Sequence, residues 1–125
     1  MRTKKIFVTG ANGFVGNSIV TKLLETKNYQ IIAGIRNGRD YPVRDIKVIR
    51  YPELSKNTNW NHVLGEVEII VHTAGRVHIT KDSAANSLAE FRRVNVEGTL
   101  NLGRQAATAG VKRFIFISSI KVNGE

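Results

Sequence analysis

The 125-residue sequence predicts a doubly wound α/β fold, in which helices cover both faces of a parallel β-sheet. Short, continuously apolar runs, which suit strands buried on both faces, alternate with stretches whose apolar residues recur every three or four positions. The first apolar run leads directly into a glycine-rich turn, and the length fits one domain. Right-handed crossovers between five such strands give an expected strand order of 3-2-1-4-5.

The first part of the chain is expected to contain two strands and one helix. Lys4–Thr9 is a short apolar run that stops at Gly10, which is typical of a buried strand. Phe14–Thr26 has the spacing of a helix with one buried face, and Tyr29–Ile35 returns to a strand pattern. The apolar residues of that helix are Val15, Ile19, Val20, Leu23 and Leu24.

The middle of the chain predicts two further strands around a short helix. Ile46–Arg50 is expected to be the third strand, since Pro52 has no N–H for a strand ladder. Trp60–Leu64 predicts a short helix in which Trp60 is a packing anchor. Glu68–His72 is the expected fourth strand, with His72 as a packed strand residue rather than an acid or base.

The last part of the chain predicts a long helix and a fifth strand. Ser87 and Glu90 have the spacing of a capping box, so the helix is expected to begin at Ser87, and Gly110 suits its left-handed end. The strand is expected at Arg113–Ser118. One face of the helix is marked by Phe91, Val94, Asn95, Gly98, Leu102 and Ala106.

Composition and net charge restrict the kinds of ligand and the cellular setting that we expect. Nineteen Lys and Arg against ten Asp and Glu give a net charge of +9, which favours anionic partners. The basic residues are scattered, so we expect phosphate-bearing small ligands and neither nucleic acid nor a membrane. The lack of cysteine excludes disulfides and Cys-ligated metals, and no metal site is predicted. No apolar stretch is long enough for a membrane span or a secretory signal, so a cytoplasmic setting is expected.

Three glycines follow the first strand at three-residue intervals, and a helix begins within them. Gly10 permits a tight turn, Gly13 lets a pyrophosphate approach the backbone, and Gly16 lets the helix pack closely on the sheet. The first amides of the helix present N–H groups and partial positive charge to an anion, and Asn12 is a candidate cap. This arrangement predicts a dinucleotide-binding site of the Rossmann type.

Four motifs in order resemble the extended short-chain dehydrogenase/reductase family of NAD-dependent epimerases and dehydratases, UDP-glucose 4-epimerase-like members in particular. They are the glycine turn from Thr9 to Gly16, Val71-His72-Thr73-Ala74-Gly75, Asn95-Val-Glu-Gly98-Thr99 and Phe116-Ile-Ser118-Ser119. The resemblance covers the whole chain and implies a five-stranded, incomplete dinucleotide-binding domain over residues 1–125, without the substrate domain.

The resemblance also implies coenzyme contacts. Gly13, Phe14 and Val15 would contact the pyrophosphate, and Glu53–Leu54 would meet the adenine. Asn95 is a further candidate for a coenzyme contact. It would lie on the buried face of its helix, where a purely structural hydrogen bond is the alternative role. Small residues would pass beneath the dinucleotide at Thr73, Ala74 and Gly75.

Ser119 is the catalytic candidate, with Ser118 the weaker choice by register. In the family this hydroxyl forms a hydrogen bond with an oxygen of the substrate. A tyrosine removes the proton of that oxygen, and a hydride passes from the adjacent carbon to the nicotinamide. None of Tyr29, Tyr41 and Tyr51 has a lysine four positions later, so the family's Tyr-x-x-x-Lys pair is lacking. The chain therefore resembles an amino-terminal piece, expected to bind coenzyme without turning over substrate.

The end of the second strand bears on the choice between NADP and NAD. An acidic residue there normally binds the adenosine ribose of NAD, whereas an arginine suits the 2′-phosphate of NADP. Ile35 occupies the expected acidic position, and Arg36 and Arg39 follow it. This favours NADP, with NAD as the alternative.

The leading functional hypothesis is an NAD(P)-dependent enzyme acting on a nucleoside-diphosphate sugar by epimerisation, dehydration or reduction. The alternative is a non-catalytic module that senses NAD(P) and regulates a partner. A nucleic-acid binder is a third hypothesis, which a flat response of binding to salt would remove. A homodimer is left open as the assembly.

Overall fold

The computed structural model describes residues 3–37, 41, 45–52, 54–73 and 84–117. Its strands form one five-stranded sheet with the order β3-β2-β1-β4-β5, in which all neighbours run parallel. The predicted fold class and strand order are therefore confirmed. The strands are β1 (Lys4–Thr9), β2 (Tyr29–Arg36), β3 (Lys47–Tyr51), β4 (Ile69–His72) and β5 (Arg113–Phe116).

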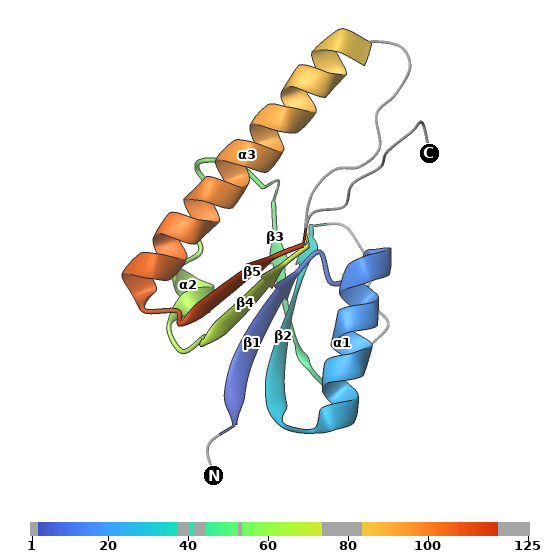
Figure 1. Ribbon diagram of the computed structural model, residues 1–125, viewed down its shortest axis with the longest axis vertical. Coiled ribbons are helices and arrows are strands. Elements are labelled where there is room, and N and C mark those ends of the chain that lie inside the picture. The colour runs from blue at the N-terminus through green and yellow to red at the C-terminus, as the bar shows by residue number, and fades with distance from the viewer. Residues whose placement is uncertain (1–2, 38–40, 42–44, 53, 74–83, 118–125) are drawn as a thin grey trace.

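Helices lie on both sides of this sheet (Figure 1). Helix α1 (Phe14–Thr26) covers one face, and α2 (Asn61–Leu64) with the long α3 (Ala84–Ala109) covers the other. Because parallel strands run in the same direction, their carboxyl ends all lie at one edge of the sheet. Strand β1 lies between β2 and β4, so the chain leaves β1 at the point where the strand order reverses. Open α/β sheets bind ligands at this point.

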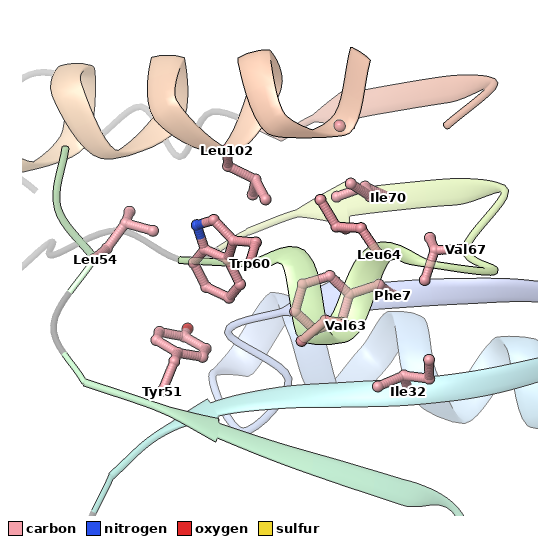
Figure 2. Packing of buried hydrophobic residues seen from close by; sticks show 11 residues of the cluster. Phe7, Ile32, Tyr51, Leu54, Trp60, Val63, Leu64, Val67, Ile70 and Leu102 are labelled. Carbon is pink, nitrogen blue, oxygen red and sulfur yellow. The ribbon is translucent and has the colours of Figure 1, made fainter. Parts of the chain in front are cut away.

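Two apolar cores, one on each face, hold the layers together. The core under α2 and α3 is centred on Trp60, which is fully buried (Figure 2). The indole ring lies 5.7 Å from the ring centre of Phe7 and 5.1 Å from that of Tyr51. The prediction that Trp60 is a packing anchor is confirmed. The core under α1 contains Ile6, Val8, Ala11, Val20, Ile31, Ala33, Ile35 and Val71.

The long helix begins earlier than predicted. Helix α3 starts at Ala84, so Ser87 and Glu90 lie inside it and the predicted capping box is wrong. Capping-box spacing is not specific to helix starts, and the two alanines before the box favour helix strongly. Its other end at Ala109, followed by Gly110 with a φ of 86°, agrees with the prediction.

Strand β1 and helix α1 have the predicted bounds, and the remaining boundaries differ from prediction by one or two residues. Strand β2 extends to Arg36 and β3 to Tyr51, whereas β4 begins at Ile69 and β5 ends at Phe116. The buried face of α1 is centred on Gly16 and Val20, with Ile19 and Leu23 partly buried. The predicted face was too wide, because Val15 and Leu24 are exposed.

Candidate functional site

The chain turns sharply where β1 ends. Gly10 has a φ of 64°, in the left-handed region that glycine enters without a Cβ penalty. Its carbonyl oxygen accepts a hydrogen bond from the Gly13 amide at 3.0 Å, which closes the turn. The Ala11 amide donates to the carbonyl of Gly34 on β2, also at 3.0 Å. The predicted role of Gly10 in a tight turn is confirmed.

Helix α1 begins directly at this turn with an open amino terminus. Its N-cap residue is Gly13, so the predicted cap at Asn12 is wrong. The chain is extended at Gly13, whose carbonyl accepts from the Asn17 amide at 2.9 Å, and this starts the helix one residue too late for Asn12. No side chain caps the helix, and its first turn contains no acidic residue. The positive end of this helix dipole therefore has no acidic partner within its own first turn.

The two later glycines have different roles. A Cβ on Gly16 would lie 2.0 Å from the Gly10 carbonyl oxygen, so only glycine lets the helix pack this closely on the turn. A Cβ on Gly13 would lie 3.3 Å from the same oxygen, and its backbone is extended rather than left-handed. The fold therefore requires Gly16 strictly and Gly13 only weakly. A side chain added at Gly13 would therefore disturb the fold much less than one added at Gly16.

Phe14 and Val15 begin the helix with side chains that point into solvent. Phe14 is 91% exposed and Val15 38% exposed. Contact with a pyrophosphate, which the sequence predicts for these residues, would come from their backbone amides. This contact stays a prediction.

A buried hydrogen-bond network supports the turn from β4 and α3. Nδ1 of His72 lies 2.7 Å from Oγ1 of Thr9, and Nε2 of His72 lies 2.9 Å from Oγ1 of Thr99. The Thr73 amide donates to Oγ1 of Thr9 at 3.0 Å. The single hydroxyl hydrogen of Thr73 is shared between the carbonyl of Thr9 at 2.6 Å and that of Gly10 at 3.3 Å.

His72 is a packed strand residue, as predicted. Its side chain is fully buried and stacks on Phe116 with 5.5 Å between ring centres. Burial lowers the pKa of His72 to about 4, because the charged imidazolium loses its hydration. At neutral pH the ring is uncharged and serves as a hydrogen-bonding link between β1 and α3.

Tyr51, at the end of β3, contacts the same turn and was not predicted as a site residue. Its hydroxyl oxygen accepts a hydrogen bond from the Gly10 amide at 3.3 Å. Burial raises the pKa of Tyr51 to about 12, so the hydroxyl stays protonated. Strand β2 lies between β3 and β1, so periodicity gave no signal that Tyr51 would reach Gly10.

Leu54, for which the resemblance implies a contact with adenine, lies in the core beside α3. Its side chain is buried against Gly98, so a contact with adenine would come from its backbone. Two amide side chains of α3 hold the loop that follows. Asn101 donates to the carbonyls of Ser55 and Thr58 at 3.1 and 2.7 Å, and Gln105 donates to that of Thr58 at 2.8 Å.

The structure brings part of the predicted site together at the carboxyl edge of the sheet. The glycine turn from Gly10 to Gly16 lies beside Thr73, and Arg36 is exposed at the end of β2. Asn95 is half-buried on α3, as its predicted position on the helix face requires. Five predicted site residues lie outside the described residues: Arg39, Glu53, Ala74, Gly75 and Ser119.

The described residues offer no cluster of three His, Asp or Glu side chains for a metal ion. No helix among them has the length and apolar character needed to cross a bilayer.

A doubly wound parallel sheet, whose first strand ends in a three-glycine turn at an open helix start, defines a Rossmann domain. The chain belongs to the NAD dependent epimerase/dehydratase family, whose family model matches residues 6–125. It is 39% identical to the UDP-glucose 4-epimerase of Vibrio cholerae over 122 residues, which cover 98% of this chain and 37% of that protein.

Solved structures share this fold. MoeE5 in complex with UDP-glucose and NAD matches with a TM-score of 0.75 and 28% identity, over 96% of this chain and 38% of that one. The UDP-glucose 4-epimerase of Thermus thermophilus, solved as a complex with NAD, shows the same fold, with a TM-score of 0.75 and 21% identity over 92% and 37% of the two chains. The present chain thus spans less than half the length of these relatives.

Proposed function

We propose that this chain is the coenzyme-binding part of an enzyme that acts on a nucleoside-diphosphate sugar. It binds the pyrophosphate of a nicotinamide dinucleotide at the turn from Gly10 to Gly16. The observation that carries this proposal is the start of α1, which has neither a side-chain cap nor an acidic first turn. Membership of the NAD dependent epimerase/dehydratase family supports it.

The binding chemistry follows from the turn. The first amides of α1 would donate to phosphate oxygens, and the helix dipole favours the negative charge placed there. Gly13 offers backbone without a side chain on the approach to those amides. The net charge of +9 adds long-range attraction for an anionic ligand.

The proposed substrate class is a uridine-diphosphate sugar, and the proposed reaction is of the UDP-glucose 4-epimerase kind. The 39% identity to the Vibrio cholerae enzyme supports it. When bound, the nicotinamide ring would accept a hydride from the sugar and return it. Ser119 would hydrogen-bond the sugar oxygen that loses its proton. The chain contains no Tyr-x-x-x-Lys, so these 125 residues are proposed to bind coenzyme without turnover.

NADP is the proposed coenzyme, with NAD as the alternative. Arg36 stands exposed at the end of β2, where a guanidinium could bind the 2′-phosphate through two donors. The two structural relatives described above are complexes with NAD, which supports the alternative.

Titration calorimetry of the Gly13→Val variant with NADP and NAD tests the proposed site. The extended backbone at Gly13 accepts a side chain, so we expect a folded protein whose binding is lost for both coenzymes. Gly65→Ala is the matched control, because a Cβ there has no neighbour within 4 Å and lies away from the turn. Unchanged binding in Gly13→Val would remove the turn as the site.

A non-catalytic sensor of NAD(P) is the second candidate function, and it gains support only if the whole protein lacks a Tyr-x-x-x-Lys pair. The natural reading frame beyond Glu125 distinguishes the two candidates. A Tyr-x-x-x-Lys pair there, with turnover of UDP-glucose by the whole protein, supports the enzyme. A frame without this pair, and coenzyme binding without turnover, supports the sensor.

A further inference from the structure

The backbone amide and the backbone carbonyl of Gly10 each form a hydrogen bond with a side-chain hydroxyl. Its amide donates to the hydroxyl of Tyr51 on β3 at 3.3 Å. Its carbonyl accepts from the hydroxyl of Thr73, just after β4, also at 3.3 Å. We call Tyr51 and Thr73 the Gly10 clamp.

Each side chain of the clamp is itself fixed in direction. The ring of Tyr51 packs edge-on against the buried Trp60, with 5.1 Å between ring centres and 61° between ring planes (Figure 2). The Thr73 hydroxyl also donates to the Thr9 carbonyl at 2.6 Å, and its amide donates to the Thr9 hydroxyl at 3.0 Å. Neither hydroxyl therefore depends on a mobile side chain to reach Gly10.

The position of Gly10 determines the geometry of the start of α1. The Gly10 carbonyl accepts the Gly13 amide at 3.0 Å, and Gly13 is the residue from which the helix begins. A rotation of the Gly10 backbone away from its left-handed φ of 64° would move this acceptor and, with it, the first amides of α1. A ligand that needs those amides binds only the fraction of molecules in which they are aligned.

We infer that Tyr51 and Thr73 are positioning residues for the dinucleotide, because their hydroxyls hold Gly10 in the conformation that aligns the first amides of α1. This inference rests on the proposed function of the glycine turn. If it holds, the end of β3 contributes to the phosphate side of the proposed site through Tyr51, in addition to the adenosine side.

Tyr51→Phe is the first test, since it removes one oxygen and keeps the ring against Trp60. We expect the dissociation constants of NADP and NAD to rise about five- to tenfold, which is the equivalent of one hydrogen bond. Binding of adenosine, which has no phosphate, should change less than twofold. The Gly10 amide should exchange its hydrogen faster in the variant, as measured by NMR.

Tyr29→Phe is the matched control, because it removes the same oxygen at the opposite end of the sheet, where β2 begins. Its coenzyme affinity should equal that of the unmodified chain. Thr73→Val tests the other half of the clamp and should weaken NADP binding to a similar degree. Thr73→Ser, which keeps the hydroxyl, should restore it.

The outcomes separate the two levels of the argument. If the unmodified chain binds neither coenzyme, the proposed function fails. If it binds and Tyr51→Phe stays within twofold, the clamp is overturned. Equal losses for adenosine and NADP would also overturn it, since the hydroxyl would then act on the fold as a whole. If Tyr51→Phe does not fold, the Thr73→Val and Thr73→Ser pair decides by the presence or absence of rescue.

Discussion

The side chain of Leu54 occupies the space beside Gly98 that a Cβ would need if any other residue stood at position 98. A Cβ at Gly98 would lie 2.5 Å from Cγ of Leu54 and 3.3 Å from its backbone carbonyl carbon. The loop after β3 thus approaches α3 closely at a glycine, and the amides of Asn101 and Gln105 hold it there.

We expect Gly98→Ala to destabilise the chain by about 1–3 kcal/mol, because Leu54 must shift and its backbone limits the movement. Gly103→Ala is the matched control on the same helix, where a Cβ would meet nothing within 4 Å. It should stabilise the chain by about 0.5–1 kcal/mol through higher helix propensity. Urea denaturation measures both, and equal effects would contradict the close approach.

Gly16→Ala should be more disruptive than Gly13→Ala. A Cβ 2.0 Å from the Gly10 carbonyl forces backbone apart from backbone, which we expect to cost about 2–3 kcal/mol of stability. At Gly13 the corresponding distance is 3.3 Å, so a loss below about 1 kcal/mol is expected there. Thermal and urea unfolding of the two variants make the comparison, and the opposite order would refute the separate roles of these glycines.

His72 should remain neutral in the folded chain far below the pH at which exposed histidines ionise. Its pKa is lowered from 6.5 to about 4, so only the unfolded chain takes up this proton as the pH falls between those values. The free energy of unfolding is therefore highest, as far as His72 is concerned, above pH 6.5. It falls by on the order of 3 kcal/mol as the pH decreases towards 4.

NMR titration of the imidazole signals checks this directly. A His72 signal that moves with a midpoint near 6.5 would contradict the buried, uncharged ring.

Arg36→Ala should separate the two coenzymes. If its guanidinium binds the 2′-phosphate, NADP affinity should fall about tenfold, the equivalent of one charge-assisted contact, while NAD affinity changes less than about twofold. Arg104→Ala, which removes an exposed arginine from α3, is the control for net charge. Equal losses for NADP and NAD would favour NAD as the coenzyme.

The architecture was predictable from sequence because it depends on local patterns. Continuous apolar runs and helical periodicity indicate the strands and helices, and right-handed crossovers leave only a few possible strand orders, of which the expected one is observed. The glycine turn was equally accessible, because the left-handed φ of Gly10 and the close approach at Gly16 both require the residue type itself.

The contacts that support the site were less accessible, because they join residues far apart in the sequence. The Tyr51 hydroxyl meets Gly10 across an intervening strand, and His72 joins Thr9 to Thr99. Capping also failed as a signal, since Asn12 and Ser87 are good capping residues in positions where the helix begins elsewhere. A cap depends on the backbone geometry of the turn, which composition does not specify.

Trp60 is the only tryptophan of the chain, and it lies where α2, the end of β3 and α3 meet. Its amide donates to Gln105 at 2.7 Å, and its ring touches that of Tyr51. Indole emission is therefore a built-in optical reporter of this junction. Loosening between the long helix and the third strand would expose the indole ring to water and shift its emission to the red, with no added label.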